Sequence, residues 1–193
     1  VQSGETVGTV IRGFTLTNGS NDMGGGIAVI GSAPTLSNLV VAGNVASESG
    51  GGLYLHTAFP FIERVEVVGN QALETGGAVY EHASGAQMIQ VDFLENDAVI
   101  RGGALHASDS ASTYTNVVFA RNTTDGHGGA IATTNGAHPL FFNATIAGND
   151  AGTDGGGIHA IGALPGLTNV VLEQNRALGG GDGAAPVVEI ADA

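Results

Sequence analysis

The sequence lacks several residue types on which whole classes of protein depend. It has no cysteine, no tryptophan and no lysine, and only five arginines oppose 18 aspartates and glutamates, which gives a formal net charge of −13. Without cysteine, a disulfide framework, thiolate catalysis and a cysteine-based zinc site are excluded. So acidic a chain disfavours nucleic acid and anionic lipid as partners. No apolar run reaches the ~20 residues of a membrane span, so we expect no direct membrane insertion.

The chain is instead rich in glycine and apolar residues. Glycine makes up 33 of 193 residues, and hydrophobic residues make up 42%. That much apolar material can pack a core, which argues against disorder. The length predicts a single domain, 1–193. Because the chain starts at Val1 without a methionine or a signal-like segment, we expect it to be a piece of a longer protein.

Two markers repeat along the chain in one register. An asparagine recurs at intervals of 26, 26, 26, 27 and 26 residues, at Asn44, Asn70, Asn96, Asn122, Asn149 and Asn175. A glycine pair recurs at the same intervals, starting at Gly24, Gly50, Gly76, Gly102, Gly128 and Gly155. Hydrophobic residues lie eight, five and three positions before each asparagine, as Leu36, Leu39 and Val41 do before Asn44. A fixed period of this length indicates a solenoid.

Two solenoid folds fit the segment that leads to each asparagine. The pattern matches the strand of a leucine-rich repeat, but that repeat needs a leucine two residues after the asparagine, where this chain has alanine or threonine. The glycine pair would also break a returning helix, and a short second strand follows it. We therefore expect an all-β, right-handed parallel β-helix of about seven rungs with three short strands each, and a leucine-rich horseshoe is the alternative. Regular rungs should span about 10–178, with a glycine-rich turn and a partial last rung at 179–193.

Stacking turns each repeat position into a column along the rod. The asparagine column predicts an inward-facing ladder of amides, each bonded to backbone or to the next asparagine. Asn116, Asn143 and Asn169 form a second, shorter column six residues earlier in the repeat. The glycine pairs predict turns with positive φ and no room for a Cβ between rungs. We interpret all of these columns as structural.

Outward positions on the strand after the glycine pair carry a cluster of aromatic side chains. They are Tyr54, His56, Tyr80, His82 and His106, on three adjacent rungs. Flat polar rings on a shallow face suit stacking on sugars, so we predict a ligand-binding site here, and paired histidines would also suit a metal or proton transfer. Glu81 is assigned to this site, because a carboxylate in an otherwise apolar column is costly unless it is paired or turns outward. A merely solvated strand face is the alternative.

A second candidate site is acidic. Glu66 and Asp92 occupy one outward column on adjacent rungs, about 4.8 Å apart. Such a pair could bind Ca²⁺, although no cofactor is required, and its spacing resembles the carboxylates of a retaining glycosidase. Glu63, Glu95 and Arg64 lie near the pair in the repeat, so a solvated acidic face is the alternative.

Several rungs carry a paired motif with a known likeness. The segments GGAV (76–79), GGAL (102–105) and GGAI (128–131), with FLEN (93–96) and FARN (119–122), resemble the repeats of chlamydial polymorphic outer membrane proteins. The chain is similar, more widely, to bacterial right-handed β-helix surface proteins with pectate-lyase-like folds, over about residues 10–178. The resemblance implies an extracellular or cell-surface rod, adhesin- or passenger-like, whose outer-membrane anchor lies outside this chain.

Three functional hypotheses follow from these features. The first is a non-catalytic β-helical segment of a surface or secreted protein that contacts glycans or surface proteins. The second is a polysaccharide lyase or glycoside hydrolase, and the third is a rod unit that stacks end to end with other copies. The resemblance implies that lyases of this fold use clustered aspartates for Ca²⁺ and a lysine or arginine base. This chain has no lysine, and no arginine falls within the tyrosine and histidine cluster, which favours the first hypothesis.

Overall fold

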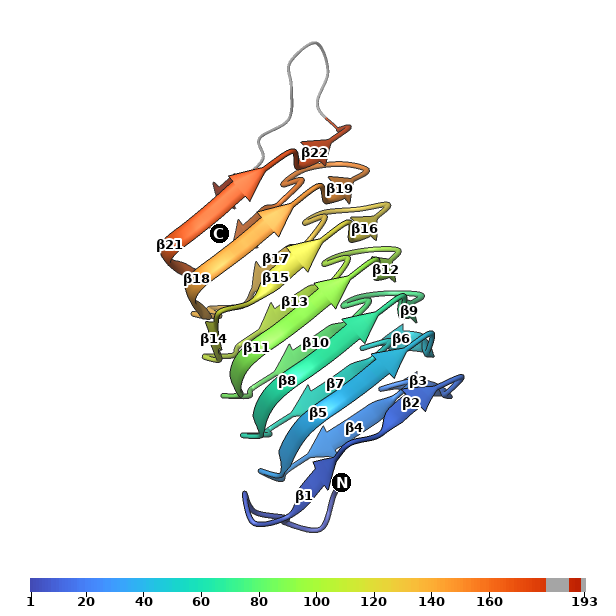
Figure 1. Cartoon of the computed structure of the whole chain (residues 1–193). Coiled ribbons are helices and arrows are strands. Elements are labelled where there is room, and N and C mark those ends of the chain that lie inside the picture. The colour runs from blue at the N-terminus through green and yellow to red at the C-terminus, as the bar shows by residue number, and fades with distance from the viewer. Residues whose placement is uncertain (180–187, 192–193) are drawn as a thin grey trace.

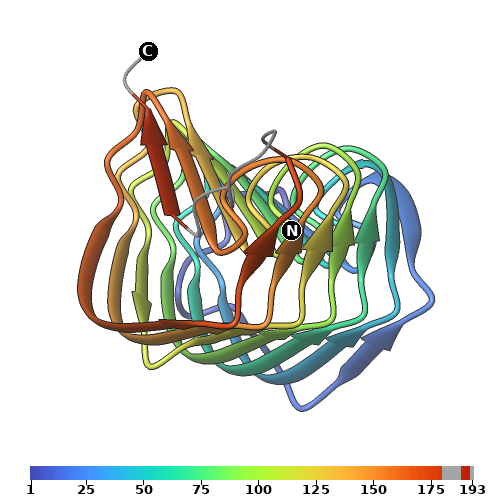
Figure 2. The same ribbon diagram turned by 90° about the horizontal axis from the view of Figure 1, so that it is seen from above.

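The chain coils into a parallel β-helix (Figure 1). The computed structural model describes residues 1–179 and 188–191. Six complete rungs stack along the rod, and each rung crosses three sheets, here named A, B and C. Strands at the front of Figure 1 run left to right and the chain returns behind them one level higher, which makes the coil right-handed. Figure 2 looks along the coil and shows the rungs superimposed.

Sheet A contains the longest strands. They are β1 (Val10–Arg12), β2 (Thr15–Thr17), β5 (Thr35–Ala42), β8 (Phe61–Val68), β11 (Gln87–Leu94), β14 (Thr113–Thr115), β15 (Val118–Ala120), β18 (Leu140–Ala147) and β21 (Gly166–Glu173). The short strands β14 and β15 share one rung, because both pair with β11 and with β18. Between them lies Asn116, whose positive φ of 55° bends the chain. Every rung bends at this position, and asparagine tolerates the left-handed conformation better than most residues.

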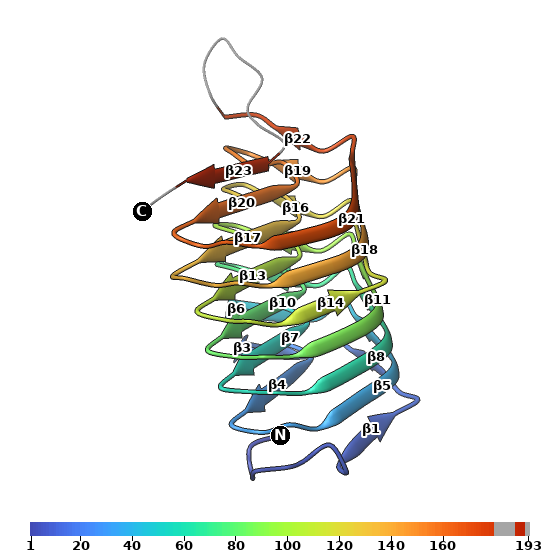
Figure 3. The same cartoon turned by 90° about the vertical axis from the view of Figure 1, so that its left-hand side faces the viewer.

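The shorter strands form the other two sheets. Sheet B contains β3 (Ser20–Met23), β6 (Val45–Ser49), β9 (Gln71–Ala72), β12 (Asp97–Ala98), β16 (Thr123–Thr124), β19 (Asp150–Ala151) and β22 (Arg176–Ala177). Sheet C contains β4 (Ile27–Ile30), β7 (Leu53–His56), β10 (Val79–His82), β13 (Leu105–Ser108), β17 (Ile131–Thr134), β20 (Ile158–Ile161) and β23 (Val188–Ala191). Figure 3 shows sheets A and C from the side, where they meet at one edge of the rod.

Equivalent residues of successive rungs lie directly above one another. Leu36 pairs with Ile62 and Val41 with Val67, so each hydrophobic column of the sequence becomes a stack inside the coil. Within this stack the rings of Phe93 and Phe119 lie 4.6 Å apart and nearly parallel. Such aromatic pairs add about 0.5–1.5 kcal/mol beyond the area they bury. The 26-residue period therefore sets both the register and the core.

The glycine pair lets each rung turn from sheet B to sheet C. The first glycine of every pair has a φ between 63° and 72°, a region that favours glycine. The second is enclosed by the next rung: a Cβ on Gly77 would lie 2.2 Å from the carbonyl oxygen of Gly103. Both expectations for the glycine pairs are confirmed.

The fold agrees with the predicted β-helix and differs in detail. The described residues contain no helix, so the leucine-rich alternative is wrong. Six complete rungs are present instead of about seven, with β1–β3 and β23 as partial rungs at either end. The predicted glycine-rich turn and partial last rung at 179–193 are described only in part, because residues 180–187 and 192–193 lie outside the described part of the chain. No helix in the described part is long and apolar enough to cross a membrane.

Candidate functional site

The asparagine column forms a buried hydrogen-bonded ladder. The backbone N–H and the side-chain amide of Asn70 both donate to Oδ1 of Asn96, each at 3.0 Å, and the same amide donates to the carbonyl of Val41 at 2.9 Å. This pattern continues from Asn44 to Asn175, and all six side chains are buried. Each asparagine thus satisfies backbone groups where the chain leaves sheet A. Its role is structural.

The tyrosines and histidines form an ordered strip on the outer face of sheet C. Tyr54 and Tyr80 stack with ring centroids 5.6 Å apart and planes 7° from parallel. Beside them His56 stacks on His82 at 5.2 Å, while His106 meets the edge of Tyr80 at 5.3 Å. Tyr54, His56, Tyr80 and His82 are half-buried, so each residue keeps part of its surface accessible. We call Tyr54, His56, Tyr80, His82 and His106 the aromatic strip.

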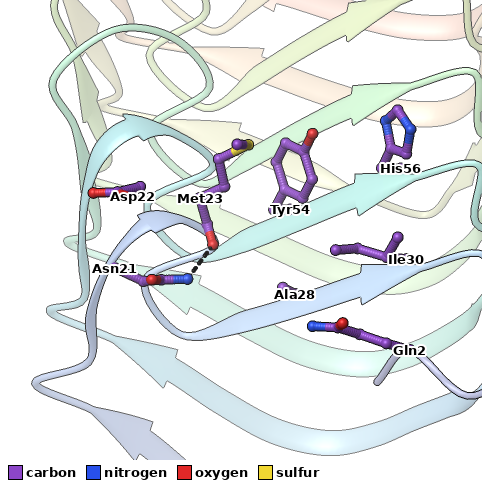
Figure 4. Close-up of a pocket in the computed structure, with 8 residues that line it drawn as sticks. All are labelled: Gln2, Asn21, Asp22, Met23, Ala28, Ile30, Tyr54 and His56. Carbon is purple, nitrogen blue, oxygen red and sulfur yellow. Dashed lines mark hydrogen bonds between the residues drawn. The ribbon is translucent and has the colours of Figure 1, made fainter.

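The turn before each glycine pair forms a wall beside this strip. The wall is the column of residues that immediately precede the pairs: Met23, Ser49, Thr75, Arg101, His127 and Asp154. Near the N-terminal end, Met23 lines a pocket of about 300 Å³ together with Tyr54 and His56 (Figure 4). Toward the other end, the rings of His127 and His159 stack at 4.5 Å, so the wall there closes onto sheet C. The strip therefore borders a recess at its Tyr54 and His56 end, and beyond its other end the wall packs against sheet C.

The recess perturbs the ionisation of its side chains. Burial raises the pKa of Tyr54, and the nearby Glu48 raises it further; burial also raises the pKa of Tyr80. His106 is only 7% exposed, and burial together with the Arg101 cation lowers its pKa to about 3. His159, at 2% exposed, has a pKa lowered to about 4 by burial and by the nearby His127 and Arg101. Both of these imidazoles are therefore neutral at physiological pH.

Two sequence-based assignments need correction at this site. His106 occupies the predicted outward column, but it is buried and not part of a solvated face. The repeat register also predicts no arginine in the cluster, yet Arg101 lies close enough to His106 to lower its pKa. Arg101 belongs to the turn wall, a column whose packing against sheet C is a tertiary feature. The residues that precede the glycine pairs recur with the same 26-residue period. This recurrence could have identified Arg101, His127 and Asp154 as neighbours of the strip from the sequence.

Glu81 does not belong to the aromatic strip. Its side chain points into the core, is wholly buried and accepts a hydrogen bond of 2.9 Å from the hydroxyl of Tyr114. Burial raises its pKa to about 7, and the hydrogen bond from Tyr114 and the nearby hydroxyl of Ser112 oppose that rise. The predicted ligand-binding role of Glu81 is wrong, because no ligand on the outer face can reach it. The alternation of the strand could have indicated this, since Val79 and Glu81 point the same way.

The acidic pair lies on a different face of the rod. Glu66 and Asp92 are exposed, directly paired neighbours on β8 and β11 of sheet A, beside Arg64 and Gln90. Arg64 forms an ion pair with Glu63, and Glu95 forms one with Arg121 at 2.9 Å. No group of three or more histidine or acidic side chains suited to a metal ion occurs in the described residues. Calcium binding by Glu66 and Asp92 stays a prediction.

Comparison with known proteins identifies one segment of this rod. Residues 116–134 match the Chlamydia polymorphic membrane protein (Chlamydia_PMP) repeat. The segment contains FARN (119–122) and GGAI (128–131), which run from sheet A through the asparagine ladder to the glycine pair. The resemblance to the polymorphic membrane protein repeat is thus confirmed. No curated protein and no solved structure matches the chain.

Proposed function

We propose that this chain is a non-catalytic β-helical segment of a bacterial surface or secreted, passenger-like protein, and that its aromatic strip contacts glycans. The polymorphic membrane protein repeat supports an outer-membrane or surface location for the parent protein. The observation that carries glycan contact is the parallel stack of Tyr54 and Tyr80 at 5.6 Å. Rings held in this way offer a rigid amphipathic surface at little cost in conformational entropy.

The surroundings of the stack favour a sugar over other ligands. The recess supplies polar atoms beside the rings, among them the imidazoles of His56 and His82, so hydroxyl groups of a sugar would find hydrogen-bond partners there. Repetition along the rod presents similar positions on successive rungs, which suits a chain of repeated sugar units. The acidic surface of the protein disfavours nucleic acid and anionic lipid.

Affinity electrophoresis in gels that contain neutral or uronic-acid polysaccharides, with and without Ca²⁺, tests the proposal. We expect at least one polysaccharide to retard the wild-type protein and the double variant Tyr54→Ala/Tyr80→Ala to lose that retardation. The matched control is Glu66→Gln/Asp92→Asn on sheet A, which should keep it. If no polysaccharide retards the protein, or if the tyrosine variant is retarded equally, the proposal fails.

The same incubations separate binding from catalysis. We expect the polymer to keep its size in chromatography after incubation with the protein. A shortened polymer would favour the carbohydrate-active enzyme instead, and the control variant would then show whether Glu66 and Asp92 cleave it. Dependence of either result on Ca²⁺ that is abolished in the control variant would assign the cation to that pair.

A further inference from the structure

Arg101 differs from the arginines that form ion pairs. Arg64, Arg121 and Arg176 each pair with a carboxylate on the surface of the rod. Arg101 has no carboxylate partner among the described residues, and its Nε is buried without a hydrogen-bond partner there. A buried guanidinium nitrogen that lacks a partner is costly, so the position calls for an explanation.

A pocket opens beside Arg101. It has a volume of about 210 Å³ and is lined by Arg101, Thr134, Asn135, Ile161 and Gly162. Asn135 donates to the hydroxyl of Ser108 at 3.0 Å, which fixes the orientation of its amide. The pocket thus combines one cation with hydroxyl and amide groups at the C-terminal end of the strip.

Two buried histidines flank this region on sheet C. In the strand register, Ala132 lies between His106 and His159, and all three side chains are buried. Nε2 of His106 contacts the hydroxyl of Thr134 at 3.1 Å, but Nδ1 of His106 and Nδ1 of His159 have no partner among the described residues. Arg101 acts on both rings electrostatically, so it lies near both. Arg101, whose own Nε lacks a partner, therefore lies near two further buried nitrogen atoms that lack one.

The nearest acidic side chain on the turn wall has another partner. Asp154 lies 3.4 Å from Nδ1 of His127, and that nitrogen also contacts the hydroxyl of Thr153 at 2.8 Å. Asp154 therefore does not neutralise Arg101 in this arrangement. The guanidinium remains available for an anion that comes from outside.

We propose that this pocket binds the carboxylate of an acidic sugar, with Arg101 as its anchor. The guanidinium fork matches a carboxylate in two parallel hydrogen bonds, and the side chains of Thr134 and Asn135, which line the same pocket, can bond further oxygen atoms. A single arginine suits a single charge, whereas the net charge of −13 opposes a polyanion with closely spaced phosphates. The pocket lies along the same strip as Tyr54 and Tyr80, so this inference rests on the proposed glycan contact and specifies a uronic- or sialic-acid unit.

Titration calorimetry with a trigalacturonate, its methyl ester, a short glutamate peptide and inorganic phosphate tests the site. We expect the free acid to bind wild-type protein roughly 10- to 100-fold more tightly than the neutral ester, as a charge-assisted pair would produce. Arg101→Gln should remove this difference, and Arg101→Lys should restore part of it. The matched control Arg121→Gln changes an arginine that is paired on the exposed surface, and it should leave both affinities unchanged.

Each result has a defined meaning. The carboxylate site is overturned if wild-type protein binds the acid and the ester equally, or if Arg101→Gln keeps the preference for the acid. In that case, loss of all binding in Tyr54→Ala/Tyr80→Ala would still support glycan contact. Equal affinity for phosphate or the glutamate peptide shows a general anion site and also overturns the assignment to a sugar. If none of these ligands binds, the carboxylate site fails, whereas glycan contact fails only when no polysaccharide retards the protein in electrophoresis. Should Arg101→Gln not fold, the imidazole resonances of His106 and His159 in wild-type protein decide: they must shift with the acid and not with the ester.

Discussion

Tyr114 donates a hydrogen bond to Glu81 across the core, with 2.9 Å between the two oxygen atoms. Tyr114 belongs to sheet A and Glu81 to sheet C of the preceding rung, so the bond joins two sheets through a wholly buried space. Oε2 of Glu81 has no partner among the described residues. A carboxyl group in this setting is more stable when protonated, because burial penalises the charged form.

Glu81 should make the stability of the protein depend on pH. Its pKa is about 7 in the folded state against an ordinary value of 4.5, so the folded state binds more protons between these values. The free energy of unfolding should therefore fall as the pH rises from about 4.5 to 7, by up to about 3 kcal/mol from this group. Glu81→Gln keeps a hydrogen-bond acceptor for Tyr114 and removes this dependence.

Urea unfolding at several pH values measures the effect. The difference in unfolding free energy between wild-type protein and Glu81→Gln should decrease from pH 4.5 to 7, because contributions from other groups cancel in the difference. Parallel stability curves for the two proteins would show that Glu81 keeps its ordinary pKa in the folded state.

His106 and His159 should have the opposite effect on stability. Their folded pKa values, about 3 and about 4, lie below the ordinary value of 6.5, so the unfolded state binds more protons in this range. Their contribution is fully present above pH 6.5 and is lost as the pH falls toward 4. Nitrogen chemical shifts of the two imidazoles should report neutral rings at pH 5, and a midpoint near 6.5 for either ring would refute this.

Removal of one ladder amide should destabilise the rod. Asn96→Ala deletes the donor to the Val67 carbonyl at 2.9 Å and the acceptor for Asn70. Leaving these buried groups unpaired should cost about 1–3 kcal/mol for each group. Asn143→Gly is the control: it deletes an exposed amide bonded to Asn116 and keeps a residue that accepts positive φ. Chemical denaturation should place the control within about 0.5 kcal/mol of wild type.

A methyl group added between two rungs should destabilise the rod more than one added where there is room for it. Gly77→Ala places a methyl group 2.2 Å from a backbone oxygen of the next rung, and the backbone must move to admit it. Gly69, unlike Gly77, has a positive φ, and no atom lies within 4 Å of the added methyl, so Gly69→Ala should cost only about 1–2 kcal/mol of backbone strain. We expect Gly77→Ala to lower the melting temperature clearly more than Gly69→Ala. Equal losses would contradict close packing at the glycine pair.

The sequence predicted those features that recur in every rung. The asparagines, the glycine pairs and the apolar columns before Asn44 and its equivalents are set by the 26-residue period, so their positions follow from spacing alone. The burial of His106 could not be obtained in this way, because it depends on side-chain packing between rungs, such as the contacts of His106 with Tyr80 and Thr134. The partner of Glu81 was likewise hidden, because Tyr114 lies 33 residues away on another sheet.

Where a small residue interrupts a column of aromatic side chains, the sequence does not show which members of the column act together. His159 shares the outward column of Tyr54 and His106, but Ala132 separates it from them, and it was left out of the cluster. In the structure Ala132 is wholly buried, and the charge of Arg101 acts on the imidazoles on both sides of it. A column that is interrupted in the sequence can therefore still belong to one site.

The three tyrosines of this chain provide the most direct test of glycan contact. Tyr54 and Tyr80 lie half-buried in the recess, whereas Tyr114 is in the core. In protein labelled with ¹³C at tyrosine, addition of a binding oligosaccharide should shift the ring signals of Tyr54 and Tyr80 and leave that of Tyr114 unchanged, while the oligosaccharide keeps its length. Unchanged signals of Tyr54 and Tyr80 across a panel of acidic and neutral oligosaccharides would contradict the account.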